Sequence, residues 1–226
     1  GWFGFNPGSS LAGGDLRISV VAVNTMIASA TGAIAATLWM WKIRGNKPDP
    51  SMMCNGMLAG LVAITAPCAF VSVGSAAIIG LISGILVIEA AFFVERKLRI
   101  DDPVGAVAVH GVNGAWGCIA LGLFADGTYG EGWNGVSGTV KGLFHGDSSQ
   151  FVAQLIGVGT NAIYVGLIGY AVFKVIDIFV GNRVSPEAEL DGLDIPEMGV
   201  IGYSGVKLDK YSETPLSKGF PAPKGK

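Results

Sequence analysis

The sequence carries little charge, and long stretches of it carry none. Only 14% of its 226 residues are Asp, Glu, Lys or Arg, whereas a soluble globular protein has about 25%. No charged residue occurs from Pro50 to Ile88, and the mean hydropathy is +0.53. Because such a chain has too little polar surface to face water on all sides, we expect a membrane protein in contact with the lipid bilayer. A net charge of −2 gives no electrostatic basis for binding nucleic acid.

Residues that hold metals, haem and disulfides are also scarce. Cys54, Cys68 and Cys118 are odd in number and show no CxxC spacing, so we interpret them as small packing residues. Haem iron commonly takes axial His ligands, but His110 is the only histidine within an apolar run, and no CxxCH motif occurs. We therefore expect no cofactor and no metal. The other histidine, His145, is expected to be a solvated loop residue.

Five long apolar runs account for most of the chain. Each is close to the ~20 residues that a helix needs to cross a bilayer, and none alternates as a membrane β-strand does. Pro67 and Gly74 divide the uncharged stretch, which as one helix would span about two bilayers. The predicted fold class is an all-α membrane protein, a polytopic helical bundle. Its helices are expected within Ile18–Trp41, Met52–Val71, Ser75–Phe93, Pro103–Ala125 and Phe151–Phe173.

The chain changes character after residue 180. We predict a transmembrane domain over residues 1–180 and a tail over residues 181–226, which is rich in Pro, Gly and charge and too short for a catalytic domain. Lys and Arg follow the first, third and fifth apolar runs and are sparse in the loops between. The positive-inside rule then places the basic loops and the C-terminus in the cytoplasm. We expect a multi-pass protein of the cell membrane that is not an enzyme.

His110 is the residue that most strongly indicates function. It lies in a run without Asp, Glu, Lys or Arg, and an ionisable group in such a run usually belongs to a substrate or proton pathway. With Asp102 as the helix cap and Pro103 at the first helical position, His110 would lie seven residues, about 10 Å, into the span. A neutral imidazole can both donate and accept hydrogen bonds. The alternative is a structural histidine bonded to a neighbouring helix.

The first ten residues, GWFGFNPGSS, have no initiator Met and no basic segment, so they are not a signal peptide. We expect the upstream part of a longer protein to precede them. Two interpretations of their aromatic residues stay open. Spacing alone favours an aromatic belt at the membrane interface. The other interpretation is a pore mouth, with Phe5 as a hydrophobic plug and Ser9 as a hydrogen-bonding group outside it.

The order of several motifs resembles the Amt/Mep/Rh ammonium transporter family. The matching segments are WFGFN followed by GS, NGMLAGLVAIT, DDPVGAVAVHG and GLDIPEMG. The resemblance as a whole extends over essentially the entire chain and corresponds to the C-terminal half of the family. The resemblance implies an eleven-helix fold, in which two inverted five-helix repeats surround a pore and the eleventh helix packs across the bundle. This chain would carry the end of the sixth helix through the eleventh. The resemblance also implies a homotrimer with one pore per subunit, and ammonium or ammonia as the substrate.

The resemblance further implies roles for four residues. His110 matches the second histidine of a mid-pore pair, and Phe5 matches one of two stacked phenylalanines at the outer mouth. Ser9 matches the serine of the outer ammonium-recruitment site, and Ala106 falls at a pore-facing position. The first histidine, the other phenylalanine and a recruitment-site tryptophan would belong to the half that precedes this chain. The implied function is transport, in which ammonium is recruited, deprotonated and conducted as ammonia, with or without a proton.

The tail departs from the family pattern. Met198 and Val200 stand where His and Glu are often found, which affects the contacts that would regulate transport, including docking of a PII-type signal protein as a candidate partner. Gly105 replaces an acidic residue of some relatives. Two alternative functions stay open. One is a membrane ammonium sensor, although the short tail offers no fused signalling domain. The other is an Rh-type gas channel, although DDPVGAVAVHG looks more like bacterial Amt proteins.

Overall fold

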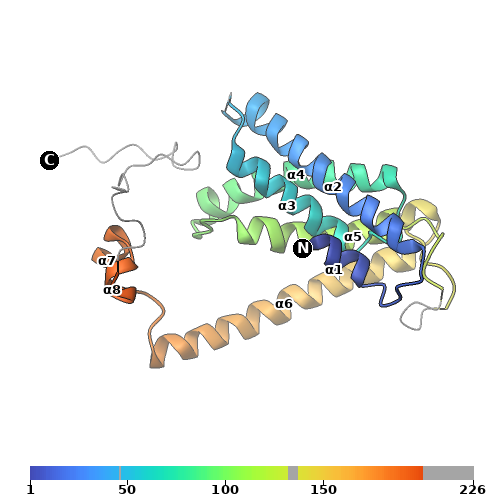
Figure 1. The fold of residues 1–226 in the computed structure, drawn as a ribbon. Coiled ribbons are helices and arrows are strands. Elements are labelled where there is room, and N and C mark those ends of the chain that lie inside the picture. The colour runs from blue at the N-terminus through green and yellow to red at the C-terminus, as the bar shows by residue number, and fades with distance from the viewer. Residues whose placement is uncertain (46, 132–136, 201–226) are drawn as a thin grey trace. The chain divides into compact units, whose positions relative to one another are not determined.

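The computed structural model describes residues 1–45, 47–131 and 137–200, and this part of the chain is helical without a β-strand. An isolated β-bridge pairs Asp126 with Lys141. The predicted all-α class is confirmed. In chain order the helices and shorter π or 3-10 turns are α1 (Trp2–Gly8), α2 (Arg17–Trp39), η1 (Met40–Gly45), α3 (Pro50–Thr65), α4 (Val73–Phe93), η2 (Val94–Leu98), η3 (Val107–Val112), α5 (Asn113–Phe124), η5 (Leu143–His145), α6 (Ser148–Phe179), α7 (Pro186–Asp191) and α8 (Asp194–Met198) (Figure 1).

Four helical segments are long and apolar enough to cross a membrane, and α3 is a shorter apolar helix. The four segments are Arg17–Gly45, Val73–Leu98, Val107–Phe124 and Ser148–Phe179. They overlap four of the five predicted runs, and α3 overlaps the remaining one, Met52–Val71. The prediction that the uncharged stretch folds back is therefore confirmed.

The second predicted run is helical over less of its length than expected. α3 ends at Thr65, and residues 66–70 form a turn instead of a helix that continues to Val71. The physical reason is Pro67, which has no N–H group to extend a helix. The next helix, α4, begins after Ser72, whose side chain accepts a hydrogen bond from the backbone N–H of Ser75 at 3.2 Å.

Glycines let α2 approach α3 and α4 closely (Figure 1). A Cβ atom added at Gly56 in α3 would lie 2.6 Å from the carbonyl oxygen of Gly32 in α2, and one added at Gly84 in α4 would lie 2.2 Å from the same oxygen. A Cβ at Gly60 would lie 2.2 Å from the carbonyl oxygen of Ala28. All of these distances are shorter than a real Cβ contact, so the three helices pack along backbone surfaces. Small residues serve the same purpose at interfaces between membrane helices in general.

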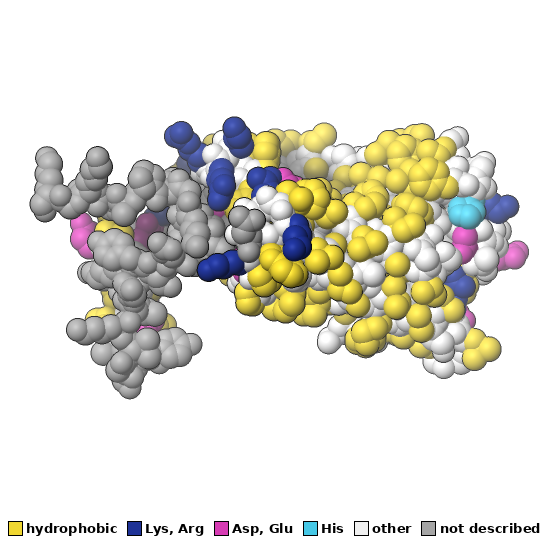
Figure 2. Space-filling view, turned by 90° about the horizontal axis from the view of Figure 1, so that it is seen from above, with side chains coloured by type: hydrophobic (Ala, Val, Ile, Leu, Met, Phe, Trp, Pro, Cys, Tyr) yellow, Lys and Arg dark blue, Asp and Glu magenta, His cyan; other side chains and the backbone are white. Residues whose placement is uncertain are grey.

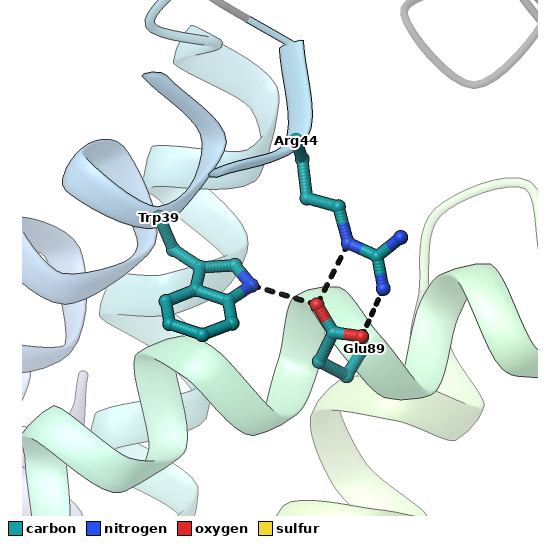
Figure 3. Close-up of polar contacts among 3 residues, drawn as sticks. All are labelled: Trp39, Arg44 and Glu89. Carbon is teal, nitrogen blue, oxygen red and sulfur yellow. Dashed lines mark hydrogen bonds and ion pairs between the residues drawn. The ribbon is translucent and has the colours of Figure 1, made fainter. Parts of the chain in front are cut away.

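A charged side chain within α4 is paired where α2 passes into η1 (Figure 3). The Glu89 carboxylate accepts a hydrogen bond from the Trp39 indole N–H at 2.7 Å and from Arg44 Nε at 2.8 Å, and it forms a second contact with Arg44 Nη2. The guanidinium groups of Arg44 and Arg96 both lie over the ring of Phe92. Such two-point pairing satisfies a carboxylate in a span that otherwise disfavours charge.

Many large apolar side chains are exposed among the described residues. Figure 2 shows one face, on which apolar side chains form a broad field and several Lys and Arg side chains gather beside it. The basic residues of η1 and η2 are brought together by the contacts around Phe92. His145 is exposed in η5, as predicted.

The chain divides into two compact units, residues Gly1–Thr160 and Asn161–Lys226, and the boundary falls within α6. The first unit contains α1 to α5 and the start of α6. In the described part of the second unit, α7 begins at Pro186 after Ser185, whose hydroxyl accepts a hydrogen bond from the backbone N–H of Ala188. Met198 and Val200 are exposed, and the rest of the tail lies outside the described residues. The predicted domain boundary after residue 180 stays a prediction.

The close packing of α2 against α4 predicts a stability difference between two matched substitutions. Gly84→Ala places a methyl group against the Gly32 carbonyl, and overpacking of this kind costs about 1–3 kcal/mol. Gly74→Ala, in the first turn of the same helix, meets no atom closer than 3.9 Å. We expect Gly84→Ala to lower the thermal unfolding midpoint of the intact protein in detergent, and Gly74→Ala to leave it unchanged or slightly higher. Equal midpoints would contradict this account.

Candidate functional site

The segment that carries His110 starts later than the sequence predicts. Pro103 lies in a turn before the helix, so its prediction as the first helical residue was wrong. The physical reason is Gly105, whose φ of +72° is incompatible with a helix running through it. Asp102 nevertheless acts as a cap, because its carboxylate accepts hydrogen bonds from the backbone N–H groups of Val107 at 3.1 Å and Ala108 at 3.3 Å.

The late start changes the expected depth of His110. His110 is the fourth residue of η3, so its backbone lies about 4.5 Å along the helix from the first residue, Val107. The sequence predicts instead a helix that begins at Pro103, with His110 about 10 Å from its start. In the described part of the chain His110 is exposed, and none of the described residues forms a hydrogen bond with its imidazole. The alternative of a structural histidine bonded to a neighbouring helix therefore has no support in this part of the chain.

His110 faces a hollow of about 570 Å³ within the first unit. The hollow lies between three segments that are far apart in the sequence: the start of α1, the end of α3, and η3 with α5. Its walls are mostly apolar or small, and their polar side chains include the His110 imidazole, the Thr65 hydroxyl and the Trp2 indole N–H. The lining residues are Gly1, Trp2, Phe5, Val62, Thr65, Ala66, His110, Gly114 and Cys118.

The structure brings together two of the four residues that the resemblance singled out. Phe5 and His110 line the same hollow, although they are separated by more than one hundred residues in the sequence. Ser9 follows α1 outside the lining, where its hydroxyl donates a hydrogen bond to the carbonyl oxygen of Phe5 at 2.7 Å. Ala106 is exposed at the start of η3 and is not a lining residue.

Helix α1 is held in place by two polar contacts. The indole N–H of Trp2 donates to the Thr65 hydroxyl at 2.8 Å, and the amide of Asn6 donates to the Thr25 hydroxyl at 3.1 Å. Trp2 therefore has a hydrogen-bond partner at the end of α3. These contacts direct one face of α1, with Phe5, towards the hollow.

Among the lining residues that sequence reasoning missed, Trp2, Thr65 and Cys118 carry an N–H, hydroxyl or thiol group. Trp2 was grouped with the other aromatic residues at the start, and Cys118 was interpreted as a packing residue. The signal for Cys118 was present, because it lies eight residues after His110, two helical steps of four along the same face, with Gly114 between them. No local signal marks Thr65, since its part in the hollow depends on α1 lying against the end of α3.

The link between α1 and α2 is fixed by a cluster of polar residues around Asp15. Its carboxylate accepts hydrogen bonds from the Tyr129 hydroxyl and from the backbone N–H of Arg17 at 2.8 Å. Arg17 in turn donates from Nε to the carbonyl oxygen of Ala69 at 2.6 Å and from Nη2 to the hydroxyl of Thr128 at 3.3 Å, and it lies over the Tyr129 ring. The cluster joins three loops at the same end of the bundle.

These contacts shift two acid–base equilibria. The hydrogen bond from Tyr129, followed by that from the Arg17 backbone, lowers the pKa of Asp15 below its ordinary 3.8. Burial, followed by the bond to Asp15, raises the pKa of Tyr129 to about 12. The pair therefore holds its stabilising form, ionised Asp15 with neutral Tyr129, across the whole neutral range.

Comparison with known sequences identifies the family of the chain. A sequence model of the Ammonium Transporter Family matches residues 1–203. The chain belongs to this family. It is 46% identical over 217 residues to the Ammonium transporter Amt2 of Archaeoglobus fulgidus, a match that covers 96% of this chain and 46% of that protein. It is 34% identical over 203 residues to the Ammonium transporter of Bacillus subtilis, covering 90% of this chain and 48% of that protein.

Solved structures of the same family share its fold. The chain matches the structure of a protein named Sensor Amt Protein with a TM-score of 0.75 and 37% identity, covering 87% of this chain and 45% of that one. It matches Mep2 of Saccharomyces cerevisiae with a TM-score of 0.74 and 26% identity, covering 82% of this chain and 41% of that one. The chain therefore spans a little under half the length of these relatives.

The Asp15 cluster predicts how the link between α1 and α2 responds to pH. Ionised Asp15 stabilises the folded link above pH 3.8, and this stabilisation is lost as the pH falls through the lower pKa that Asp15 has in the folded state. Neutral Tyr129 stabilises the link below pH 10, and this stabilisation is lost as the pH rises through about 12. We expect hydrogen exchange of the amides in this link, corrected for intrinsic rates, to stay constant from about pH 5 to about pH 9.

Tyr129→Phe removes the hydroxyl and is expected to speed exchange in the link throughout that range. Tyr164→Phe, on an exposed tyrosine of α6, is the matched control and should leave the link unchanged. A protection pattern in Tyr129→Phe equal to that of the wild type would show that the hydroxyl does not fix the link.

Proposed function

We propose that the protein carrying this chain transports ammonium across a cell membrane through a pore in which His110 contacts the passing ammonia. The hollow in which Phe5 and His110 meet is the single observation that carries this proposal. Family membership supports it, because curated relatives are named ammonium transporters. The substrate is ammonium on one side of the membrane and ammonia within the pore.

The chemistry of the hollow favours ammonia over potassium. Ammonium and potassium are alike in size and charge, but only ammonium can lose a proton and continue as a neutral molecule. An apolar passage excludes an ion that stays charged, because its desolvation is costly. A neutral imidazole at His110 offers both a donor and an acceptor to ammonia. The proposal therefore assigns selection to deprotonation before the hollow and hydrogen bonding within it.

Each of the four residues receives a role. Ser9, together with aromatic faces that attract cations, recruits ammonium at the outer mouth. Phe5 closes the mouth to hydrated ions, and the proton leaves before or at this ring. His110 accepts ammonia as one member of a histidine pair whose other member lies outside this chain, and the released proton either stays behind or follows along the two rings. Ala106 does not line the hollow, and its proposed place is a pore-facing position one turn from His110, beyond the hollow itself.

The setting of the pore follows from the same reasoning. We propose a homotrimer in the cell membrane, with the basic ends of η1 and η2 and the tail in the cytoplasm. The distribution of Lys and Arg supports this orientation. A PII-type signal protein is the proposed partner of the tail, and no cofactor is required.

Replacement of His110 tests the proposal. In proteoliposomes that contain the intact protein, we expect His110→Ala to reduce the ammonium current at least tenfold or to let potassium pass. The physical reason is that the variant lacks the hydrogen-bonding group which substitutes for water around ammonia. Ammonium and potassium currents are measured side by side, and His145→Ala, on an exposed loop histidine, is the matched control.

Unchanged, selective current in His110→Ala would make this residue structural and would place the filter elsewhere. Ammonium binding by the wild type without any ammonium flux would favour the sensor function. Electroneutral ammonia flux without current, measured by internal pH, would favour an Rh-type gas channel.

A further inference from the structure

His110 lies in an irregular part of its helix. Residues Val107–Val112 form the π-helical turn η3, and the regular helix α5 begins immediately afterwards at Asn113. π turns are rare and are frequently found at functional sites. An α-helical residue advances the helix by about 100°, and a π turn advances it by less. The turn therefore decides in which direction His110 points relative to α5.

The side chain of Asn113 holds this turn together. Its Nδ2 donates a hydrogen bond to the carbonyl oxygen of Ala108, five residues earlier, at 2.9 Å. Its backbone N–H is bonded to the carbonyl oxygen of His110. Asn113 thus bonds two backbone carbonyls within the turn, one before His110 and that of His110 itself.

The stability of the fold does not by itself explain an asparagine at this position. Asn113 is fully buried, and its Oδ1 has no hydrogen-bond partner among the described residues. Burying an unpaired carbonyl is unfavourable, and an apolar side chain of similar size would avoid that cost. The favourable contribution of this side chain is its bond to the π turn.

The face of the helix that the turn controls is the face that lines the hollow. His110, Gly114 and Cys118 follow one another at intervals of four residues, and all three line it. Asn113 is not among the lining residues. Its influence on the hollow is therefore exerted through the backbone of η3 and not by contact with a passing molecule.

We propose that Asn113 is a positioning residue for ammonium conduction, whose amide holds the π turn that directs His110 into the hollow. This inference rests on the proposed function of His110. Without the amide the turn relaxes towards regular α-helix, and the imidazole of His110 rotates away from the hollow that Phe5 also lines. The recruitment of ammonium at Ser9 is expected to be unaffected, because the Ser9 hydroxyl is bonded to the carbonyl oxygen of Phe5 in α1.

The test uses the intact protein in proteoliposomes, with Asn113→Leu and Asn113→Ala beside His110→Ala. The matched control is Ser83→Ala, which likewise removes a fully buried side-chain bond to a backbone carbonyl of its own helix, from Oγ to Ile79 at 2.9 Å. Currents are normalised to the amount of inserted protein and measured against ammonium concentration, with potassium as the second ion.

For Asn113→Leu and Asn113→Ala we expect at least a tenfold lower maximal ammonium current, or a tenfold higher ratio of potassium to ammonium current. The half-saturating ammonium concentration should stay within twofold of the wild type, and Ser83→Ala should change neither quantity more than twofold. A loss caused only by poor folding would lower the amount of inserted protein without changing the selectivity or the current per inserted protein.

Three outcomes would overturn the inference. The first is wild-type current and selectivity per inserted protein in both Asn113 variants. The second is an equal change in Ser83→Ala, and the third is failure of both Asn113 variants to fold, which would make the residue purely structural. If His110→Ala alone loses selective current, the proposed function stands and only the role of Asn113 fails. If His110→Ala conducts normally, the proposed function itself fails.

Discussion

The close approach of α2 to α3 and α4 is the constraint on which the rest of the first unit depends. The carbonyl of Gly32 in α2 lies where Cβ atoms of Gly56 and Gly84 would otherwise be, so the three helices share one tight backbone interface. Helices in a bilayer gain little from the hydrophobic effect when they associate, and close packing takes its place. This packing fixes the position of α3, and α5 lies against α3. The positions of both helices, which form part of the wall of the hollow, therefore depend on the packing of α2.

Breaks in the helices are the second feature on which the hollow depends, because they set the course of the backbone around it. Each break leaves backbone groups that lipid cannot satisfy, and at three places in the first unit a buried polar side chain bonds such groups. Asn24 donates to two carbonyl oxygens of the turn after α3, Asp102 accepts from the first two N–H groups of η3, and Asn113 donates within η3. The irregular backbone is thus tolerated where it shapes the hollow.

Several features could be predicted from the sequence because their causes are local. The absence of charge marked the membrane helices, Pro67 marked the turn between α3 and α4, and Asp102 was correctly expected to cap the helix of His110. The prediction that Pro103 is the first helical residue was wrong. It relied on the pattern of an acidic residue followed by proline, whereas the positive φ of Gly105 delays the start of the helix. Nothing in the residue pattern predicted that η3 would be a π turn, since that geometry depends on a side-chain bond from Asn113.

By itself, the sequence determined the membrane environment, the all-α class and the family, because composition, length of apolar runs and motif order are properties of the chain alone. Only the tertiary structure decided which residues meet in the hollow, among them Trp2, Thr65 and Cys118 beside His110. In a membrane helix apolar residues lie on every face, so hydrophobic periodicity does not reveal which face is turned inwards. That choice depends on contacts between segments far apart in the sequence, here α1 against the end of α3 and α3 against α5.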